Sequence, residues 1–411
     1  MTPPKLAYIP ELVERHYDEL QFLWAQRESA LRSPKYTMRE FSALEQRIEG
    51  HVQGMLVAGV DLIRMVEEGL TSEDPPTSFA AAYALLRLEN ETATLAVIQA
   101  FSAAQGKQMH GLRQALSLAR MEQILPSLPF LFFSSATPTV AAAADVLACH
   151  GALPPPGLTI ETLLQDEDAA VRETGWRVVA NSGLGVDPKL FAAAVRDEVL
   201  TVRRAGLWAA AWTAVPGALL LARQLAETPA PDNLYALELL AILGGAEDVR
   251  RMTTIAKNQG LGLARFKLVG SFGHPTLVEL LLAELANPDP EIAAAAGAAF
   301  SKITAQDIDS KDRTTLPPED GKEPDDFEAE FLDEVTLPDP ELARTGWNKM
   351  KPQLSRAIRV CRGFDMSRGA SPEVLAKLDM ESRWEFFLRS KFTRAWSGSP
   401  ADLERFPQAQ A

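Results

Sequence analysis

The first 70 residues place apolar side chains at the spacing of two long helices. Apolar residues recur every three or four positions from about residue 11 to residue 31, and the sequence SPKYT then interrupts the pattern. A second stripe begins after Thr37 and Glu40, which have the spacing of a capping box. The two stripes consist of Leu12, Val13, His16, Leu20, Leu23 and Trp24, and of Met38, Phe41, Leu44, Ile48, Val52 and Met55. This pattern predicts an antiparallel helical pair over residues 1–70.

Residues 71–305 repeat a shorter helical pattern. Residues that interrupt helices recur about every 28 to 33 positions, at Gly151, Gly183, Pro216-Gly217, Gly245, Gly273 and finally Ala305. A period of this length is typical of helical solenoids, in which short helix pairs stack along one axis. The prediction is therefore an all-α superhelix of stacked helix pairs.

Two of the repeat segments share an acidic start and a Val-Arg pair. They read DEDAAVRETGWRVVANSG and RDEVLTVRRAGLWAAAWT, and their alignment places Arg172 opposite Arg203. Asp168 in the first segment, and Asp289 in a third segment NPDPEIAAAAGAAFSKITA, are placed to cap the helix start. Arg172 and Arg203 either reach the acidic turn of a neighbouring repeat or remain in solvent, and the sequence leaves both alternatives open.

The composition agrees with many short helices and adds one acidic segment. Of 411 residues, 46% are hydrophobic and 7% aromatic, and 28 are proline. The formal net charge is −14, and residues 306–341 hold 14 acidic but three basic residues, a local charge of −11. This predicts an exposed acidic linker or loop over residues 306–341, followed by a C-terminal helical cap over residues 342–411. Since no comparable basic excess exists, neither nucleic acid nor an anionic membrane is expected as a partner.

The sequence favours a cytoplasmic protein. The start MTPPKLAYIPELVERHYDEL lacks the charged and apolar regions of a secretory signal. Cys149 and Cys361 have no metal-binding or redox spacing, which favours a reducing compartment and buried thiols. The uncharged run over residues 205–222 reaches the short limit for a transmembrane helix. Because Pro216-Gly217 divides this run, two buried helices are the favoured interpretation.

The sequence contains no recognisable catalytic, cofactor-binding or metal-binding motif. No two of the five histidines stand at metal-ligand spacing on a helix, and the segment DIDSKD lacks the glycine and glutamate of a calcium loop. Cys149 and His150 are adjacent, so they point to different sides of a helix, which favours a core cysteine and a helix-end histidine over a catalytic dyad. We therefore expect a protein that is not an enzyme and that holds no cofactor or metal.

A solenoid offers an extended concave surface, and such surfaces usually hold another protein or peptide. Tryptophan and arginine are the residue types that most often dominate a protein interface. The candidates for partner binding are Trp176, Arg204, Trp208 and Trp212. Tryptophan at helical spacing is more often part of a core, and this alternative also stays open.

Short helix pairs with an acidic turn and a Val-Arg pair resemble HEAT-like repeats. Three segments resemble more narrowly an uncharacterised proteobacterial family of HEAT-like proteins: LWAQRESALRSPKYTMREFSALEQRIEGHVQGMLVAG, the central repeats, and LPDPELARTGW followed by RVCRGF. Genes of this family typically lie near components of type VI secretion. The resemblance implies a HEAT-like solenoid and a cytoplasmic adaptor or chaperone that binds a secreted effector or a spike component.

Other functions remain open at this stage. One alternative is an immunity protein that uses the same HEAT-like scaffold to bind and neutralise a toxin. Some HEAT-like folds support lyase or base-excision chemistry, although base excision requires a basic groove and this chain is acidic. A purely structural protein, closed into a dimer through its terminal helices, is a further alternative, and the oligomeric state stays open.

Overall fold

The computed structural model describes residues 8–134, 136–152, 159–316 and 332–405. The described chain is mostly helical, with a few short strands, which confirms the all-α class in its main feature. The chain divides into two compact units. Unit 1 consists of residues 1–215, 379–384 and 393–411, and unit 2 of residues 216–378 and 385–392.

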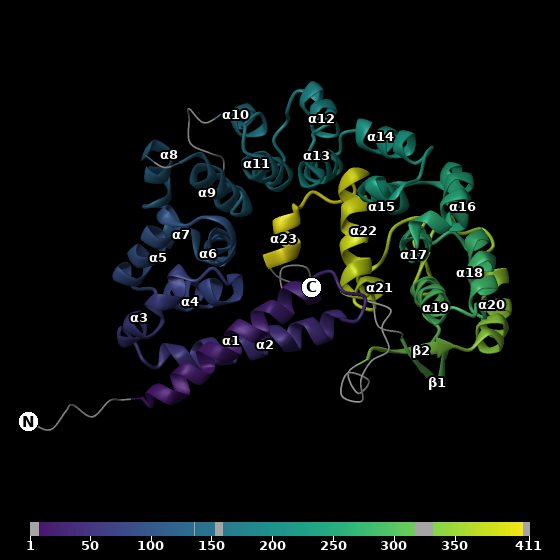
Figure 1. The fold of residues 1–411 in the computed structure, drawn as a ribbon, viewed down its shortest axis with the longest axis horizontal. Coiled ribbons are helices and arrows are strands. Elements are labelled where there is room, and N and C mark those ends of the chain that lie inside the picture. Colours follow the sequence, from purple (N-terminus) through teal and green to yellow (C-terminus); the bar gives the residue numbers. More distant parts are fainter. Residues whose placement is uncertain (1–7, 135, 153–158, 317–331, 406–411) are drawn as a thin grey trace, which may run out of the picture. The chain divides into compact units, whose positions relative to one another are not determined.

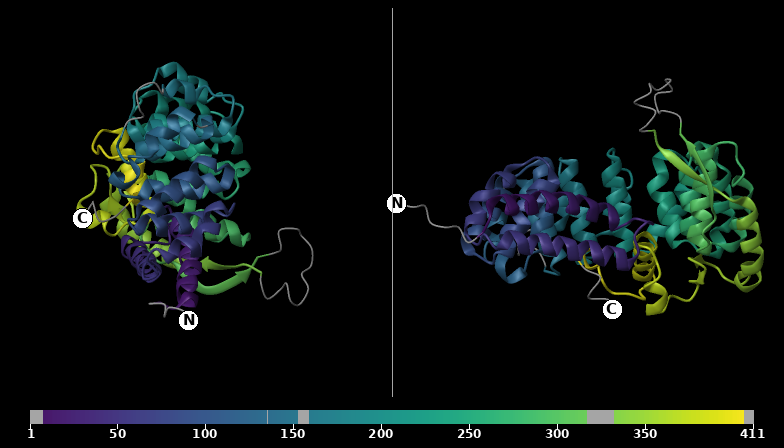
Figure 2. Two further views of the ribbon diagram at one scale, coloured as in Figure 1. Left: turned by 90° about the vertical axis from the view of Figure 1, so that its left-hand side faces the viewer. Right: turned by 90° about the horizontal axis from the view of Figure 1, so that it is seen from below.

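Unit 1 begins with two helices that run side by side, α1 (Pro10–Ala30) and α2 (Met38–Leu56) (Figure 1; Figure 2 shows them from two other directions). The predicted capping box starts α2, because the Glu40 amide donates to Thr37 and the Thr37 amide donates to the Glu40 carboxylate. The predicted apolar stripe of α2 is buried apart from Met38, which is half-buried. Leu12 departs from the predicted stripe of α1, since 47% of its surface is exposed.

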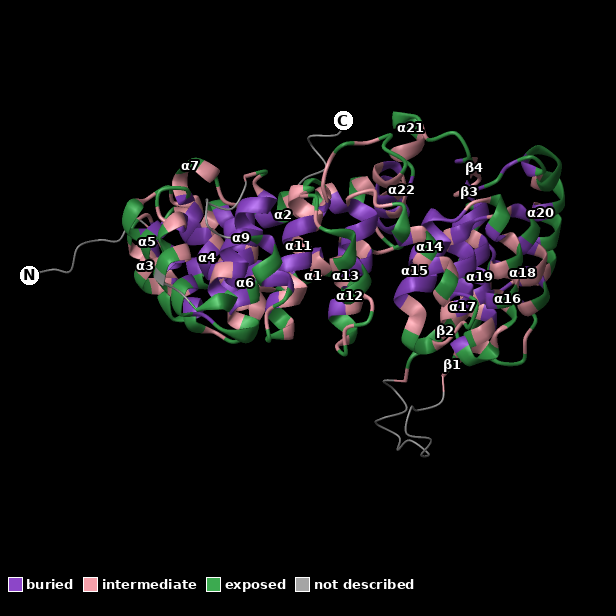
Figure 3. Cartoon of the chain, turned by 90° about the horizontal axis from the view of Figure 1, so that it is seen from above, coloured by how far each residue is buried: buried purple, intermediate pink, exposed green. Residues whose placement is uncertain are grey.

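The rest of unit 1 is a succession of short helices. Their bounds are α3 Asp61–Val66, η1 Glu67–Thr71, α4 Pro75–Arg87, α5 Glu91–Ala103, α6 Gly106–Leu118, α7 Met121–Ile124, η2 Leu128–Phe130, α8 Leu131–Ser134, α9 Thr137–Cys149, α10 Ile160–Leu164, α11 Ala169–Ser182, α12 Pro188–Ala194, α13 Leu200–Trp212 and α23 Pro400–Arg405. Helices α4, α6, α9, α11 and α13 pack successively against one another, and α1 packs against α4. Buried residues gather along these packed faces (Figure 3).

Local signals of the repeat set the ends of these helices. Asp168 caps α11 by accepting the Ala170 amide at 2.9 Å, and Gly183 ends the same helix in the left-handed conformation. In unit 2, Asp289 caps α19 in the same way, as predicted. Gly206 in α13 lies so close to α12 that a Cβ atom there would collide with the Cβ of Ala194. The small residue is therefore needed for helix approach.

Arg172 links the turn before α11 to the turn before α13. Its Nε and Nη2 atoms donate to the Asp197 carboxylate at 2.8 and 2.9 Å, and its Nη1 donates to the Asp166 carbonyl at 2.8 Å. Arg203 instead donates to the Asp197 and Glu198 carbonyls of the turn before its own helix. The sequence left open whether each arginine reaches a neighbouring acidic turn or stays in solvent. Arg172 reaches the neighbouring turn.

Unit 2 continues with helices and contains all the named strands of the described residues. Its elements are α14 Gly217–Leu225, η3 Pro231–Asn233, α15 Leu234–Leu243, η4 Ala246–Asp248, α16 Val249–Lys257, η5 Gln259–Leu261, α17 Ala264–Phe272, η6 Pro275–Leu277, α18 Val278–Glu284, α19 Pro290–Thr304, β1 Asp309–Thr315, β2 Glu334–Pro338, α20 Pro340–Leu354, β3 Val360–Cys361, β4 Phe364–Asp365 and α21 Pro372–Leu375. Helix α22 (Met380–Phe392) contributes residues to both units. Helices α15, α17 and α19 pack successively.

The acidic segment over residues 306–341 was expected as a linker or loop, but its described parts contain a strand pair. Strand β1 pairs antiparallel with β2, and Arg313 lies opposite Thr336. Residues 317–331 of the segment lie outside the described residues. Charge dominates the composition of this stretch, and it conceals the β-branched residues Thr314, Thr315, Val335 and Thr336 that suit the paired backbone.

The C-terminal part of unit 2 is fixed by buried polar contacts. Arg359 is 6% exposed, and it donates to the carbonyls of Ala241 at 3.0 Å and Gly244 at 2.9 Å. It thereby satisfies carbonyls at the end of α15. On α18, Glu279 accepts hydrogen bonds from Arg344, Trp347 and Lys351 of α20.

The uncharged run over residues 205–222 is divided as expected. Helix α13 ends at Trp212 and α14 begins at Gly217, so Pro216-Gly217 separates the two helices. Within the described ranges, no helix combines the length and the apolar character that a membrane crossing requires.

Candidate partner-binding pocket

Unit 1 contains a pocket of about 510 Å³ whose walls come from α1, α6, α11, α13, α22 and α23. Two residue types dominate its lining. The tryptophans are Trp176, Trp208, Trp212 and Trp384, and the arginines are Arg32, Arg113, Arg177 and Arg204. Ligand pockets usually have volumes of roughly 300–1,000 Å³ and a few convergent polar groups, and this pocket has both properties.

The structure brings all four predicted partner-binding residues to this pocket. Arg204, Trp208 and Trp212 follow one another at four-residue spacing on α13, so they share one face. Arg204 is exposed and Trp208 is half-buried. Trp176 and Trp212 are 2% and 3% exposed, so most of each ring belongs to the core. Trp176 packs against Phe191, with ring centroids 4.9 Å apart.

Trp384 joins the aromatic wall from a distant part of the sequence. Its ring lies 4.9 Å from that of Trp208 and 5.4 Å from that of Trp212, measured between centroids. The Cζ atom of the Arg32 guanidinium lies 4.3 Å from the centroid of the Trp384 ring. A cation in this position is attracted by the negative face of the aromatic ring. Backbone contacts hold this segment in place, because the Met380 amide donates to the Tyr36 carbonyl at 2.8 Å.

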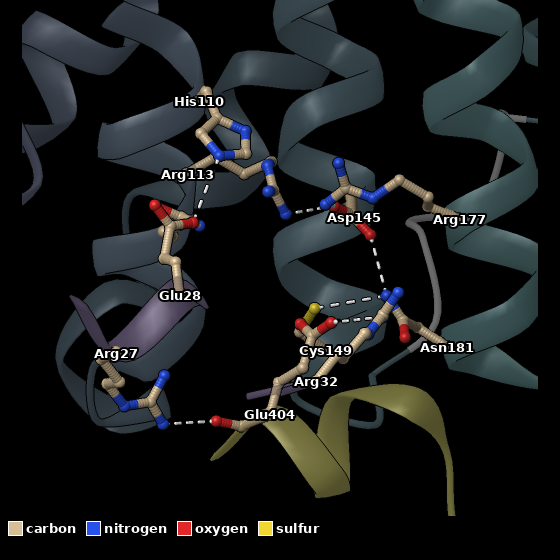
Figure 4. Close-up of polar contacts among 11 residues, drawn as sticks. Arg27, Glu28, Arg32, His110, Arg113, Asp145, Cys149, Arg177, Asn181 and Glu404 are labelled. Atoms are coloured by element: carbon tan, nitrogen blue, oxygen red, sulfur yellow. Dashed lines mark hydrogen bonds and ion pairs between the residues drawn. The ribbon is translucent and has the colours of Figure 1, made fainter. Parts of the chain in front are cut away.

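Asp145 binds two of the arginines that line the pocket (Figure 4). This carboxylate on α9 is fully buried, and it accepts from Arg113 at 2.7 Å, Arg177 at 2.6 Å and Asn181 at 3.0 Å. Burial alone raises the pKa of the Asp145 carboxyl, but the positive charges of Arg177 and Arg113 outweigh it and hold the pKa below its ordinary value. One carboxylate therefore keeps two guanidinium groups of like charge side by side.

Cys149 is a buried thiol beside this cluster. Burial, and then the negative charge of Asp145, raise the pKa of Cys149 to about 12. The thiolate, which is the nucleophilic form, is scarce at neutral pH. His150 ends α9, and its Nε2 lies 3.0 Å from the Leu116 carbonyl. These contacts confirm the interpretation of Cys149 as a core residue and of His150 as a helix-end residue.

Two of the three glutamates that line the pocket, Glu28 and Glu404, have partners within the chain. Glu28 lies 3.6 Å from His110 and accepts from Gln114, and Glu404 lies 3.4 Å from Arg32 (Figure 4). Burial raises the pKa of Glu28, but the hydrogen bonds from His110 and Gln114 outweigh it and lower the pKa. These two carboxylates are therefore engaged with nearby donors.

Sequence reasoning did not identify Asp145, Arg113, Arg177 or Trp384 as parts of a site. For Asp145 a signal exists, because it is the lone charge in the apolar helix segment AAAADVLAC, and a buried carboxylate needs a cation. For Trp384 no local signal exists, since its contacts depend on the tertiary structure.

Within the part of the chain that the structure describes, no group of three or more His, Cys, Asp or Glu residues is placed to hold a metal ion. No protein-family model matches the sequence. No curated protein has significant similarity to it either.

Proposed function

We propose that this chain is a non-enzymatic scaffold that holds another protein, and that the pocket of unit 1 is the anchor site. The observation that carries this proposal is the arrangement of Trp208, Trp384 and Arg177 around one cavity, with Arg177 held by a buried carboxylate. Tryptophan and arginine are enriched among residues that dominate binding energy. Side chains that are already fixed lose little conformational entropy when a partner binds.

We further propose that the helices of residues 71–305 are HEAT-like repeats, preceded by a helical pair and followed by a helical cap. The aspartate cap of α11, the contact of Arg172 with the following turn and the successive packing of α9, α11 and α13 support this assignment. In such arrays each unit contacts its neighbours and leaves an extended surface for a partner.

The family resemblance suggests which partner to test first. It points to a cytoplasmic adaptor or chaperone of type VI secretion, with an effector or a spike component as its partner. The immunity function remains the alternative, because a toxin inhibitor uses the same kind of surface. An enzyme of the lyase type receives less support, because the buried Cys149 thiol, with a pKa of about 12, is not an activated nucleophile.

The test is a quantitative affinity purification from cells, with the wild-type chain and two variants. Trp208→Ala removes an indole from the pocket, whereas Phe22→Ala removes an aromatic ring that is 64% exposed on α1 and does not line the pocket. The proposal expects at least one reproducible partner that W208A loses and F22A keeps. Equal recovery of every partner by all three proteins would contradict it.

Deletion of the gene separates the two candidate roles. Loss of an adaptor blocks export of its effector and leaves the cells viable. Loss of an immunity protein poisons the cells, and inactivation of the cognate toxin restores growth. Secretion and viability, measured in the same strain, distinguish these outcomes.

A further inference from the structure

Four arginines give the lining of the unit 1 pocket many hydrogen-bond donors. Each guanidinium carries five N–H donors. The structure gives Arg177 one hydrogen bond, to Asp145, and gives Arg32 one long contact, to Glu404 at 3.4 Å. The side chains of these two arginines are 35% and 49% exposed. The indole nitrogens of Trp208 and Trp384 are buried and have no acceptor among the described residues.

Of the three glutamates that line the pocket, Glu28 and Glu404 are engaged within the chain, and the negative charge of Glu173 acts on Arg177. Glu28 is engaged by His110 and Gln114, and Asp145 lies fully below the surface, bound to two arginines. Four arginines and three glutamates line the pocket, and Asp145 is a fourth carboxylate behind them, so the pocket is close to neutral in a chain of net charge −14. Within this neutral pocket the partly exposed guanidinium groups of Arg32 and Arg177 are the groups that suit an anion with oxygen acceptors.

The rest of the pocket lining is apolar, and it suits an apolar group of the ligand next to the anion. The half-buried Trp208 contributes ring surface, backed by the buried Trp384, and the half-buried Ala205 and Leu31 add aliphatic surface. Aromatic side chains bind such walls through offset or edge-to-face contacts. A volume of about 510 Å³ is too large for a single carboxylate and lies within the range for a drug-sized ligand.

We propose that the pocket recognises an acidic peptide segment of the partner, in which a glutamate or aspartate lies beside an aromatic residue. The carboxylate accepts hydrogen bonds from Arg32 and Arg177, and the aromatic ring packs against Trp208. A guanidinium binds a carboxylate in a planar, two-point geometry, which gives both affinity and specificity. This inference rests on the proposed scaffold function and specifies the chemistry of the partner.

The experiment uses the full chain and two synthetic peptides, acetyl-Glu-Phe-Glu amide and acetyl-Gln-Phe-Gln amide. Isothermal titration calorimetry gives the affinities. The intrinsic tryptophan fluorescence comes from the protein alone, because neither peptide contains tryptophan, and four of the protein's seven tryptophans line the pocket. We expect the glutamate peptide to bind at least about 10-fold more tightly than the glutamine peptide, and its affinity to fall as salt is added. Inorganic phosphate is titrated as the alternative anion.

Three variants locate the binding site. Arg32→Gln removes a half-exposed donor, and Arg177→Lys keeps the positive charge beside Asp145 but loses the planar fork, so both are expected to fold. Each is expected to weaken the glutamate peptide by roughly 10-fold. Arg39→Gln, on the exposed surface of α2, removes the same charge outside the pocket and is expected to leave the affinity unchanged.

Circular dichroism melting confirms that each variant is folded before it is titrated. Equal binding of the two peptides, equal binding by R39Q and R32Q, or binding of phosphate alone overturns the inference. If the peptides do not bind but the purified partner still requires Trp208, the scaffold proposal stands and the acidic-segment inference fails. If the glutamate peptide binds through Arg32 and Arg177 but no cellular partner requires Trp208, the scaffold proposal fails and the binding chemistry stands.

Discussion

His16 and His51 lie opposite each other on α1 and α2, with their Nδ1 atoms 3.1 Å apart. At this distance the Nδ1–H of one imidazole donates a hydrogen bond to the Nδ1 of the other. The accepting Nδ1 therefore carries no proton. A second proton has no place between the two rings. Burial lowers the pKa of His51, and the charge of His16 lowers it further, whereas Glu19 opposes the shift.

Acid therefore destabilises unit 1 through this pair. Because the folded state holds the pKa of His51 below its unfolded value, the neutral form is favoured by folding, and stability falls as pH decreases below about 6.5. We expect His51→Gln to reduce the loss of melting temperature between pH 7.5 and pH 5.5. His150 and His274 also have lowered pKa values, so part of the acid effect persists in the variant. Identical pH profiles of H51Q and wild type would exclude this role of the pair.

Neutralisation of the buried Asp145 carboxylate is expected to destabilise the protein strongly. In Asp145→Asn, the guanidinium groups of Arg113 and Arg177 lose the charge that holds them together. Breaking a buried ion pair from one side typically costs about 3–5 kcal/mol. Urea denaturation measures the loss, and Asp18→Asn on the exposed surface of α1 serves as the control. A loss below about 1 kcal/mol in D145N would show that the cluster is not needed for stability.

Two glycine-to-alanine changes in helices are expected to have opposite signs. Gly206→Ala places a methyl group against the Ala194 Cβ, and overpacking of this kind costs about 1–3 kcal/mol. Gly50→Ala lies inside α2, where the added Cβ meets no atom within 4 Å, so the higher helix propensity of alanine stabilises the chain by about 0.5–1 kcal/mol. Thermal melting of both variants tests the difference. If G206A is as stable as wild type, α12 and α13 do not require the small residue.

The contact between Arg172 and Asp197 is expected to be stronger than an exposed ion pair. Both side chains are 13% exposed and share two hydrogen bonds, whereas Arg120 and Glu89 are 67% and 61% exposed. A double-mutant cycle with Arg172→Ala and Asp197→Asn should give a coupling energy of roughly 1–2 kcal/mol. The same cycle at Arg120 and Glu89 should give at most about 0.5 kcal/mol. Equal couplings would mean that the contact between Arg172 and Asp197 is no stronger than an exposed ion pair.

The local features of this fold follow from the sequence, because short-range chemistry determines them. The capping box of Thr37, the aspartate caps of α11 and α19 and the turn at Gly183 depend on a few neighbouring residues. The division of the run over residues 205–222 follows from one proline in the same way. In each case the backbone groups at a helix end need a partner that the adjacent residues supply.

The pocket was only partly predictable. Arg204, Trp208 and Trp212 share a helix face, so their proximity follows from helical spacing. Trp384 and Glu404 complete the same pocket from the far end of the chain, and nothing in the local sequence shows which elements they approach. The strand pair of β1 and β2 was missed because charge concealed the β-branched residues.

The contact of Arg405 with the Ser117 carbonyl joins positions 288 residues apart, and Arg27 donates to the Glu404 carbonyl over a separation of 377 residues. Because a ribosome synthesises the chain from its N-terminus, these late residues arrive after all of unit 2 has been made. Trp208 and Trp212 are likewise made long before Trp384, their neighbour in the aromatic wall of the pocket. The pocket therefore combines residues made early and in the middle of synthesis with residues made near its end, and it is complete only when the C-terminal segment has joined unit 1.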